Sequence, residues 1–280
     1  MSRSSPTAKR RRIARELRRL RAEKGTTVTD VARAVGLSSS ALSRIETADV
    51  SAQPPVVGAL LRYYGVDETD VTALVDLAKQ ARKRGWWAPY NDVLPEWFEV
   101  YVGLESEAVK VRKYEPQLVP GLLQTADYAR AIIRAAHPNA TDVEVDRRVE
   151  LRLQRQERDE PLAMWAVVDE AVLRRTVGDA KVMRGQLERV IEAANMPGND
   201  IQVLPFAVGE HGSMGSGFSV LSFADHRDHS VVYIETRAGS LYLEEPDEVV
   251  TYETLFDHLR ATAIGAKQSI EMMSDAIRSL

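Results

Sequence analysis

Apolar residues near the N-terminus recur at the spacing of helices rather than of strands. Ile13, Leu17 and Leu20 fall at i, i+4 and i+7, which places them on one face of a helix. Gly25 ends that helix, and two shorter amphipathic stretches follow on either side of Gly36. Two short helices joined by a glycine-containing turn are typical of a helix-turn-helix. The pattern therefore predicts a helix-turn-helix within a helical N-terminal domain.

Two further helices complete this domain. One begins at Pro54, because proline favours the first turn of a helix, and the other begins at Asp67. The last helix ends at Gly85 after a run of basic residues, which suit the negative end of a helix dipole. We therefore expect an all-α bundle of five helices over residues 1–85.

The helix that follows Ser38 divides into an aliphatic side and a side of serine and arginine. Leu42 and Ile45 lie on the first side, and Ser43 and Arg44 lie on the second. A recognition helix needs this division, because its apolar side packs on the other helices while short polar side chains admit the backbone into the major groove of DNA. Arg44 could donate two hydrogen bonds to guanine. An ordinary amphipathic surface helix, with serines for solubility, is the alternative interpretation.

The next segment, residues 86–160, reads as a helical connector packed on the domain that follows. A helix is expected from Trp97 to Tyr114. A capping box at Thr141 opens a second, highly charged helix.

After Pro161 the pattern changes to short β-like runs that alternate with helices. Such alternation favours an α/β domain with a mixed sheet over residues 161–280. The strands are expected at residues 162–168, 201–206, 218–223, 231–235 and 240–243. The chain is thus expected to be multidomain, with a helix-turn-helix bundle, a helical connector and an α/β domain.

Charge is divided unevenly along the chain. Residues 1–85 hold 17 Lys and Arg against 9 Asp and Glu, whereas residues 86–280 hold 20 against 32, within a formal net charge of −4. A basic head on an acidic body indicates an anionic polymer as the partner of the head, double-stranded DNA first. A solvated basic tail is the plainer interpretation.

The composition excludes several classes of protein and of functional site. The 280 residues include no cysteine, which excludes disulfides, thiolate zinc sites and cysteine nucleophiles. No run approaches the roughly 18 apolar residues of a membrane span, and the N-terminus has no apolar stretch typical of a secretory signal. We therefore expect a cytoplasmic protein without a membrane segment.

Motifs of catalysis are weak in this sequence. There is no G-x-S-x-G nucleophile elbow, and the Gly/Ser-rich run 212–217 lacks the lysine of a phosphate loop. We therefore predict that the protein is not an enzyme and has neither a cofactor nor a metal site. The turn 226–229, which contains two histidines, is interpreted as a solvated turn. Glu170, His211 and Glu235 are candidates for a polar pocket, although ion pairs with Arg174 or Arg175 are the favoured explanation of the two glutamates.

Residues 13–65 resemble the Xre/Cro-type helix-turn-helix repressors. The matching motifs are Leu17-Arg18-Arg19-Leu20-Arg21, Gly25, Val31-Ala32, Val35-Gly36-Leu37-Ser38, Leu42-Ser43-Arg44-Ile45-Glu46 and Leu60-Leu61-Arg62-Tyr63-Tyr64-Gly65-Val66. The resemblance implies a DNA-binding bundle of five helices in which Arg21 pairs with Glu46 for structural reasons. It further implies base contacts from Ser39, Ser40, Arg44 and also Ser43, and phosphate contacts from Thr27, Ser38 and Thr47.

The segment after the recognition helix departs from that family. Many relatives carry glycine and basic residues there, whereas this chain has Ala48 and Asp49. An aspartate repels phosphates, so we expect no DNA contact from this loop. Arginines of the first helix could compensate, and their phosphate contacts would make DNA binding steeply dependent on salt. These are Arg10, Arg11, Arg12 and Arg15, for which a solvated helix face is the alternative.

Residues 86–270 resemble the C-terminal domain of a group of actinobacterial Xre-type regulators. The motifs that carry the resemblance include EPQLVPGLLQT at 115–125, DEAVLRR at 169–175, VLPF at 203–206 and VYIE at 232–235. The resemblance implies a domain without assigned biochemical activity. It belongs to regulators that are often encoded beside a small partner protein, and some of these have been likened to antitoxins.

Together these patterns predict a sequence-specific DNA-binding transcription regulator whose C-terminal domain binds a small partner protein or a ligand. A homodimer is expected, because one helix-turn-helix reads only a half-site. The alternative is an antitoxin-like interaction protein that neutralises a small neighbour through its acidic body and uses DNA binding for autoregulation.

Overall fold

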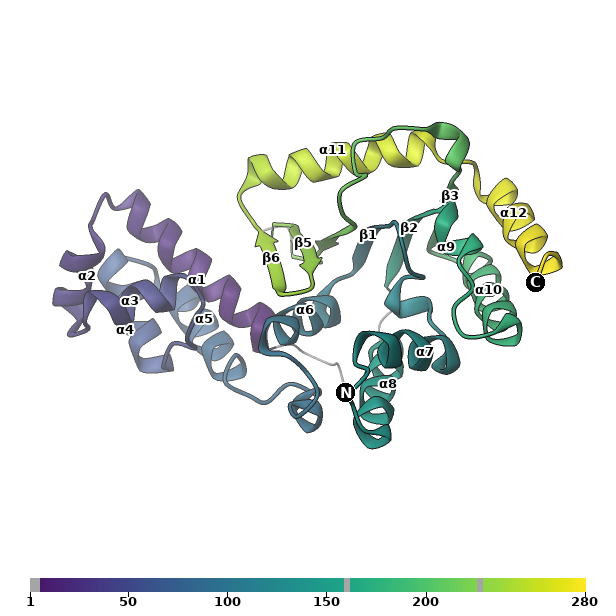
Figure 1. The fold of residues 1–280 in the computed structure, drawn as a ribbon. Helices are drawn as coiled ribbons and strands as arrows, with labels where there is room; N and C mark the ends of the chain where they lie inside the picture. The colour runs from purple at the N-terminus through teal and green to yellow at the C-terminus, as the bar shows by residue number, and fades with distance from the viewer. Residues whose placement is uncertain (1–5, 159–161, 226–228) are drawn as a thin grey trace. The chain divides into compact units, whose positions relative to one another are not determined.

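The computed structural model describes residues 6–158, 162–225 and 229–280 (Figure 1). Within these ranges the chain divides into two compact units, with the boundary between Ala88 and Pro89. The described part of the first unit is helical, and the second unit combines helices with a mixed sheet. The multidomain architecture expected from the sequence is therefore confirmed. No helix in the described ranges is long and apolar enough to cross a membrane.

The helices of the N-terminal unit begin and end where short polar residues and glycines direct them. Thr27, Ser38 and Asp67 each accept a backbone hydrogen bond in the first turn of the helix that follows. Gly36 and Gly65 close two helices with φ of +74° and +85°, a left-handed conformation that glycine adopts readily. The helices are α1 (Pro6–Glu23), α2 (Val28–Val35), α3 (Ser39–Glu46), α4 (Pro54–Tyr64) and α5 (Glu68–Gln80).

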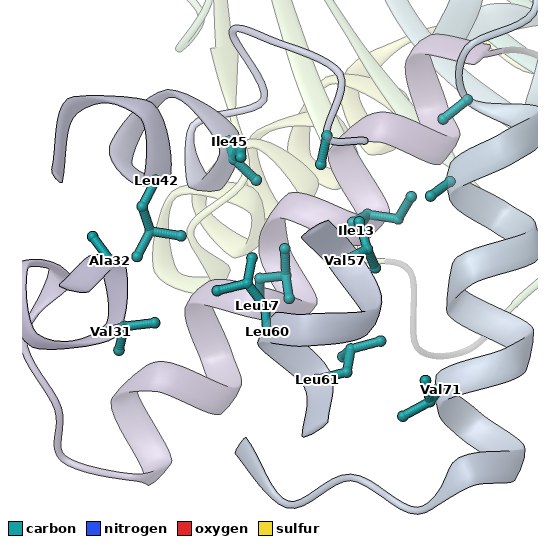
Figure 2. Close-up of a cluster of buried hydrophobic side chains, with 13 residues drawn as sticks. Ile13, Leu17, Val31, Ala32, Leu42, Ile45, Val57, Leu60, Leu61 and Val71 are labelled. Atoms are coloured by element: carbon teal, nitrogen blue, oxygen red, sulfur yellow. The ribbon is translucent and has the colours of Figure 1, made fainter. Parts of the chain in front are cut away.

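An apolar core joins these helices (Figure 2). Leu17 of α1, Val31 of α2, Leu42 of α3 and Leu60 and Leu61 of α4 are fully buried. Burying one such side chain contributes roughly 1.5–3 kcal/mol relative to leaving it in water. The apolar side of each amphipathic stretch therefore holds the bundle together.

The C-terminal unit is built on a sheet with six strands among the residues described, in the order β3-β2-β1-β4-β5-β6. Strands β1, β2 and β3 run parallel, whereas β4, β5 and β6 form an antiparallel meander beside β1. The five strands predicted after residue 161 are all present. The strands are β1 (Lys110–Glu115), β2 (Ala163–Asp169), β3 (Asn199–Leu204), β4 (Phe218–Ser222), β5 (Val231–Thr236) and β6 (Gly239–Leu243).

Strand β1 corrects the prediction of a helix that continues to Tyr114. The helix is α6 (Glu96–Glu107), which ends where Ala108 takes an extended conformation, and residues 110–115 then enter the middle of the sheet. The connector expected over residues 86–160 is therefore not wholly helical. The charged sequence KVRKYE concealed the strand, because a strand covered on both faces usually reads as a continuous apolar run.

Helices cover both faces of the sheet (Figure 1). On one face Phe256 of α11 (Pro246–Thr262) packs edge-on against Trp165 of β2, with 6.2 Å between ring centroids. On the opposite face Tyr101 of α6 contacts Tyr233 of β5, with 4.2 Å between centroids. The remaining helices are α7 (Ala126–Ala136), α8 (Asp142–Gln156), α9 (Glu170–Arg174), α10 (Ala180–Ala194), α11 (Pro246–Thr262) and α12 (Ala266–Arg278).

Candidate nucleic-acid interface

Helices α2 and α3 are joined by a tight turn, and local hydrogen bonds define both of their starts. The Thr27 hydroxyl oxygen accepts a hydrogen bond from the Asp30 amide at 3.2 Å, which caps α2. Gly36 turns the chain, and the Ser38 hydroxyl oxygen accepts from the Ala41 amide at 3.1 Å, which caps α3. The helix-turn-helix predicted from the sequence is therefore present.

Helix α3 turns one side toward the bundle and the other toward solvent. Leu42 and Ile45 are 0% and 7% exposed and pack in the apolar core. The opposite side carries short hydroxyl side chains and one arginine. All the residues predicted to contact DNA on or beside these two helices are exposed, namely Thr27, Ser38, Ser39, Ser40, Ser43, Arg44 and Thr47.

The polar groups on the exposed side of α3 differ in how far they are already engaged. Ser39 donates to the Thr29 hydroxyl at 3.4 Å, and the Thr47 hydroxyl lies 2.8 Å from a carboxylate oxygen of Asp49. The Arg44 guanidinium has no hydrogen-bond or ion-pair partner among the residues that the structure describes. Its five N–H donors are therefore available for a ligand outside the protein.

The segment after α3 has an unusual backbone and an acidic side chain. Ala48 takes a φ of +60°, in the left-handed region that favours glycine, and it is buried. Asp49 is exposed beside Thr47 and accepts its hydrogen bond. A carboxylate at this position repels phosphate, and the absence of a DNA contact from this loop stays a prediction.

Arg21 and Glu46 form the ion pair that the family resemblance implies. Arg21 Nε lies 2.9 Å and 3.0 Å from the two carboxylate oxygens of Glu46, and Arg21 also donates to the Thr26 carbonyl at 3.3 Å. The hydrogen bond to Glu46 raises the pKa of the Arg21 guanidinium above its ordinary value. The pair joins α1 to the end of α3 and so supports the position of α3.

The arginines predicted to reach phosphates from α1 lie between the apolar residues of that helix. Arg10, Arg11, Arg12 and Arg15 are all half-buried. Arg11, Arg12 and Arg15 each have an interaction within the chain. A phosphate contact from this cluster would therefore have to compete with interactions already made.

Glu170, predicted for a polar pocket, is an ion-pair partner. One carboxylate oxygen lies 2.9 Å from Arg174 Nη2, and the other accepts a hydrogen bond from the Phe206 amide at 2.9 Å. Both oxygens are engaged, as the ion-pair interpretation of this residue expected.

His211 and Glu235 lie on opposite faces of the sheet. His211 Nε2 is 3.2 Å from the phenol oxygen of Tyr114, which packs in the core beneath α11. Glu235 accepts a hydrogen bond at 2.9 Å from Tyr233, which packs against α6 on the other face. Strands β2 and β5 are three strand spacings apart, about 14 Å. Glu170, His211 and Glu235 therefore do not meet in one pocket.

Sequence reasoning missed a buried pair of charges in the C-terminal unit. Arg155 of α8 donates two hydrogen bonds of 2.8 Å to Glu105 of α6, and the two side chains are 5% and 3% exposed. The partners are 50 positions apart in the chain, so no local spacing reveals them. The signal available in the sequence was the high number of arginines in the helix that the Thr141 capping box predicts.

The turn with two histidines falls largely outside the described residues, which omit 226–228. Across the described ranges, no group of three His, Cys, Asp or Glu could hold a metal ion.

Comparison with known families matches each unit separately. Residues 12–74 match the family described as Helix-turn-helix domain, and residues 98–275 match the family described as Domain of unknown function (DUF5753). No curated protein and no solved structure matches the chain. The helix-turn-helix domain suggests a DNA-binding regulator, and the second family has no stated function.

Proposed function

The chain belongs to the DUF5753 family, and since a helix-turn-helix domain precedes that domain, we propose that the protein is a cytoplasmic, sequence-specific transcription regulator of the Xre type. The exposed side of α3 carries the proposal. The serine side chains on this side are short, and the Arg44 guanidinium has no partner among the described residues. The aliphatic side of α3 packs in the core of the bundle. Such a helix can enter a major groove without disturbing the bundle.

We assign the DNA contacts as follows. Arg44, Ser39, Ser40 and Ser43 face the base edges, where Arg44 donates to a guanine. Thr27, Ser38 and Thr47 flank them and face the phosphates. Because one bundle reads a half-site, a homodimer would bind two half-sites about 34 Å apart.

Arg44→Ala tests the base contact directly. We expect the variant to lose about 1–3 kcal/mol of binding free energy at the specific site, with little change on unrelated duplexes. The measurement is fluorescence anisotropy on both DNAs, at one salt concentration, after genomic footprinting has identified the site. Arg62→Ala serves as the control, because Arg62 is also an exposed arginine but lies on α4 and pairs with Glu68 at 2.6 Å. An equal loss on every duplex would reassign Arg44 to phosphate.

The α1 arginines predict a second, electrostatic property. If Arg10, Arg11, Arg12 and Arg15 reach phosphates, replacing all four by glutamine should make the plot of log affinity against log salt shallower by about 0.9 for each phosphate that is no longer neutralised. The measurement is operator affinity at several salt concentrations, with circular dichroism to verify folding. An unchanged slope would leave these arginines a structural or solvent-facing role.

We propose that the C-terminal unit binds a small partner protein or a ligand. The excess of acidic residues beyond residue 85 favours a basic partner and an antitoxin-like role as the second candidate. Co-purification of the product of a neighbouring gene, undiminished when residues 1–88 are deleted, would support that candidate. Dependence on the helix-turn-helix unit would count against it.

A further inference from the structure

Charged side chains lie on the face of the sheet that α6 and α8 cover. We call Glu105, Lys113, Glu115, Arg152 and Arg155 the buried charge layer. Lys113 and Glu115 alternate along β1 and therefore face the same side, and their charged atoms are 3.0 Å apart. The Arg155–Glu105 pair lies in the same layer, and the Arg155 guanidinium stands 5.4 Å from the Tyr101 ring centroid.

Arg152 is the member of the buried charge layer without an opposite charge at ion-pair distance. Lys113 and Arg155 each have a carboxylate within 3.0 Å. Arg152 instead donates to the neutral side-chain oxygen of Gln124 at 2.9 Å, and no carboxylate of the described residues forms an ion pair with it. The layer therefore holds three cations and two carboxylates.

Among nearby carboxylates, Glu235 favours the charged form of Arg152 most, but it forms no ion pair with Arg152 in the described part of the chain. The carboxylate accepts a hydrogen bond from Tyr233 and is exposed, so water screens its charge. Burial, followed by the like charge of Arg155, lowers the pKa of Arg152 to about 10, and Glu235 and Glu105 offset this in part. The surroundings therefore disfavour the positive charge on Arg152, and an additional anion at this position would stabilise the charged form.

The Arg152 guanidinium lies close to the backbone at Gly121. A Cβ on Gly121 would lie 2.8 Å from Arg152 Nη1, so a larger residue at position 121 would displace the guanidinium from its present place. Gln124 is itself buried and donates to the Val119 carbonyl at 2.7 Å, which holds its oxygen toward Arg152. Arg152 is half-buried and so remains in reach of solvent. Arg152 is thus oriented by Gln124, only partly compensated by carboxylates, and partly exposed.

We propose that Arg152 binds a small oxyanion, the carboxylate or phosphate group of an effector, between α8 and the Gly121 segment. This inference rests on the proposed ligand-binding role of the C-terminal unit. The planar guanidinium offers paired donors that match either group. The bound anion would supply the third negative charge of the buried charge layer.

The test measures thermal unfolding of the full chain as inorganic phosphate or succinate replaces chloride at constant ionic strength. We expect a saturable rise of about 3 °C in the midpoint with one of the two anions, because a ligand that binds the folded state stabilises it. Arg152→Gln should abolish the rise, whereas Glu235→Gln should increase the apparent affinity at least twofold by removing a competing carboxylate. Arg148→Gln, one turn earlier on α8, is the matched control and should respond as the wild type does.

Equal responses of the wild type and Arg152→Gln would overturn the inference, as would a wild type that responds to neither anion. If Arg152→Gln does not fold, Glu235→Gln decides, and an unchanged affinity in that variant refutes the site. Operator binding is measured in parallel without either anion. A wild type that fails to bind any operator would refute the proposed regulator while leaving the anion result intact.

Discussion

Replacement of Arg155 by alanine should lower the free energy of unfolding of the C-terminal unit by about 3–5 kcal/mol. The change leaves the Glu105 carboxylate buried at 3% exposure without its two hydrogen bonds of 2.8 Å. Removing one partner of a buried pair is costly, because the remaining charge stays out of water with nothing to compensate it. Urea unfolding, followed by hydrogen exchange in β1 and α8, measures the loss within this unit.

A double replacement separates the effect of charge from the effect of packing. Arg155→Met together with Glu105→Leu removes both charges and keeps apolar volume, so it should recover most of the stability. If the double variant is as unstable as Arg155→Ala, packing by the arginine stem rather than charge pairing holds α8 to α6.

The same pair should give the unit a characteristic response to acid. Burial raises the pKa of the Glu105 carboxyl, but attraction and hydrogen bonding by Arg155 outweigh burial and hold this pKa below its ordinary value of about 4.3. Its stabilising contribution is therefore complete above the ordinary pKa and is lost as the pH falls through the folded-state pKa. The doubly apolar variant should lack this part of the acid sensitivity.

Replacement of Leu42 by alanine should destabilise the N-terminal unit by about 2–5 kcal/mol and abolish operator binding at 37 °C. Leu42 is fully buried in the core, so truncation leaves a cavity that the surrounding helices fill only in part (Figure 2). Because α3 carries both this side chain and Arg44, loss of packing also removes the proposed DNA-reading surface. Thermal unfolding and operator titration measure the two effects.

The control for Leu42→Ala is a substitution at the next residue. Ser43→Ala changes the exposed side of α3 and should alter stability by no more than about 0.5 kcal/mol. The unfolding transition of the C-terminal unit should be unchanged by either replacement, because the two units have separate cores. A Leu42→Ala protein that keeps wild-type stability and operator affinity would show that the aliphatic side of α3 does not anchor the bundle.

The N-terminal unit could be predicted in detail because its signals are local. Helical spacing at Ile13 and Leu17, the cap at Ser38 and the turn at Gly36 each involve residues only a few positions apart. Hydrogen bonds inside one turn and burial of one face suffice to define each helix. The exposure of the serine side of α3 follows from the same helical spacing.

Strand β1 could not be predicted, because its charged residues obscure the pattern of a buried strand. Lys113 and Glu115 are tolerated in the middle of the sheet because they pair with each other and because α6 and α8 bring Glu105 and Arg155 beside them. None of these partners is visible from strand propensity. For the same reason Glu170, His211 and Glu235, which look alike as candidates in the sequence, belong to three separate surroundings in the fold.

The amino-acid sequence alone determined the helix-turn-helix, the two-part charge distribution, the mixed sheet and the polar side of α3. Only the tertiary structure decided which of these charges form ion pairs: Arg155 pairs with Glu105, Lys113 pairs with Glu115, and Arg152 pairs with neither carboxylate. The physical reason is the range of the interactions involved. Periodicity and capping act within a helical turn, whereas the Arg155–Glu105 pair joins residues 50 positions apart and Lys113 also donates to Ser219, 106 positions away on β4.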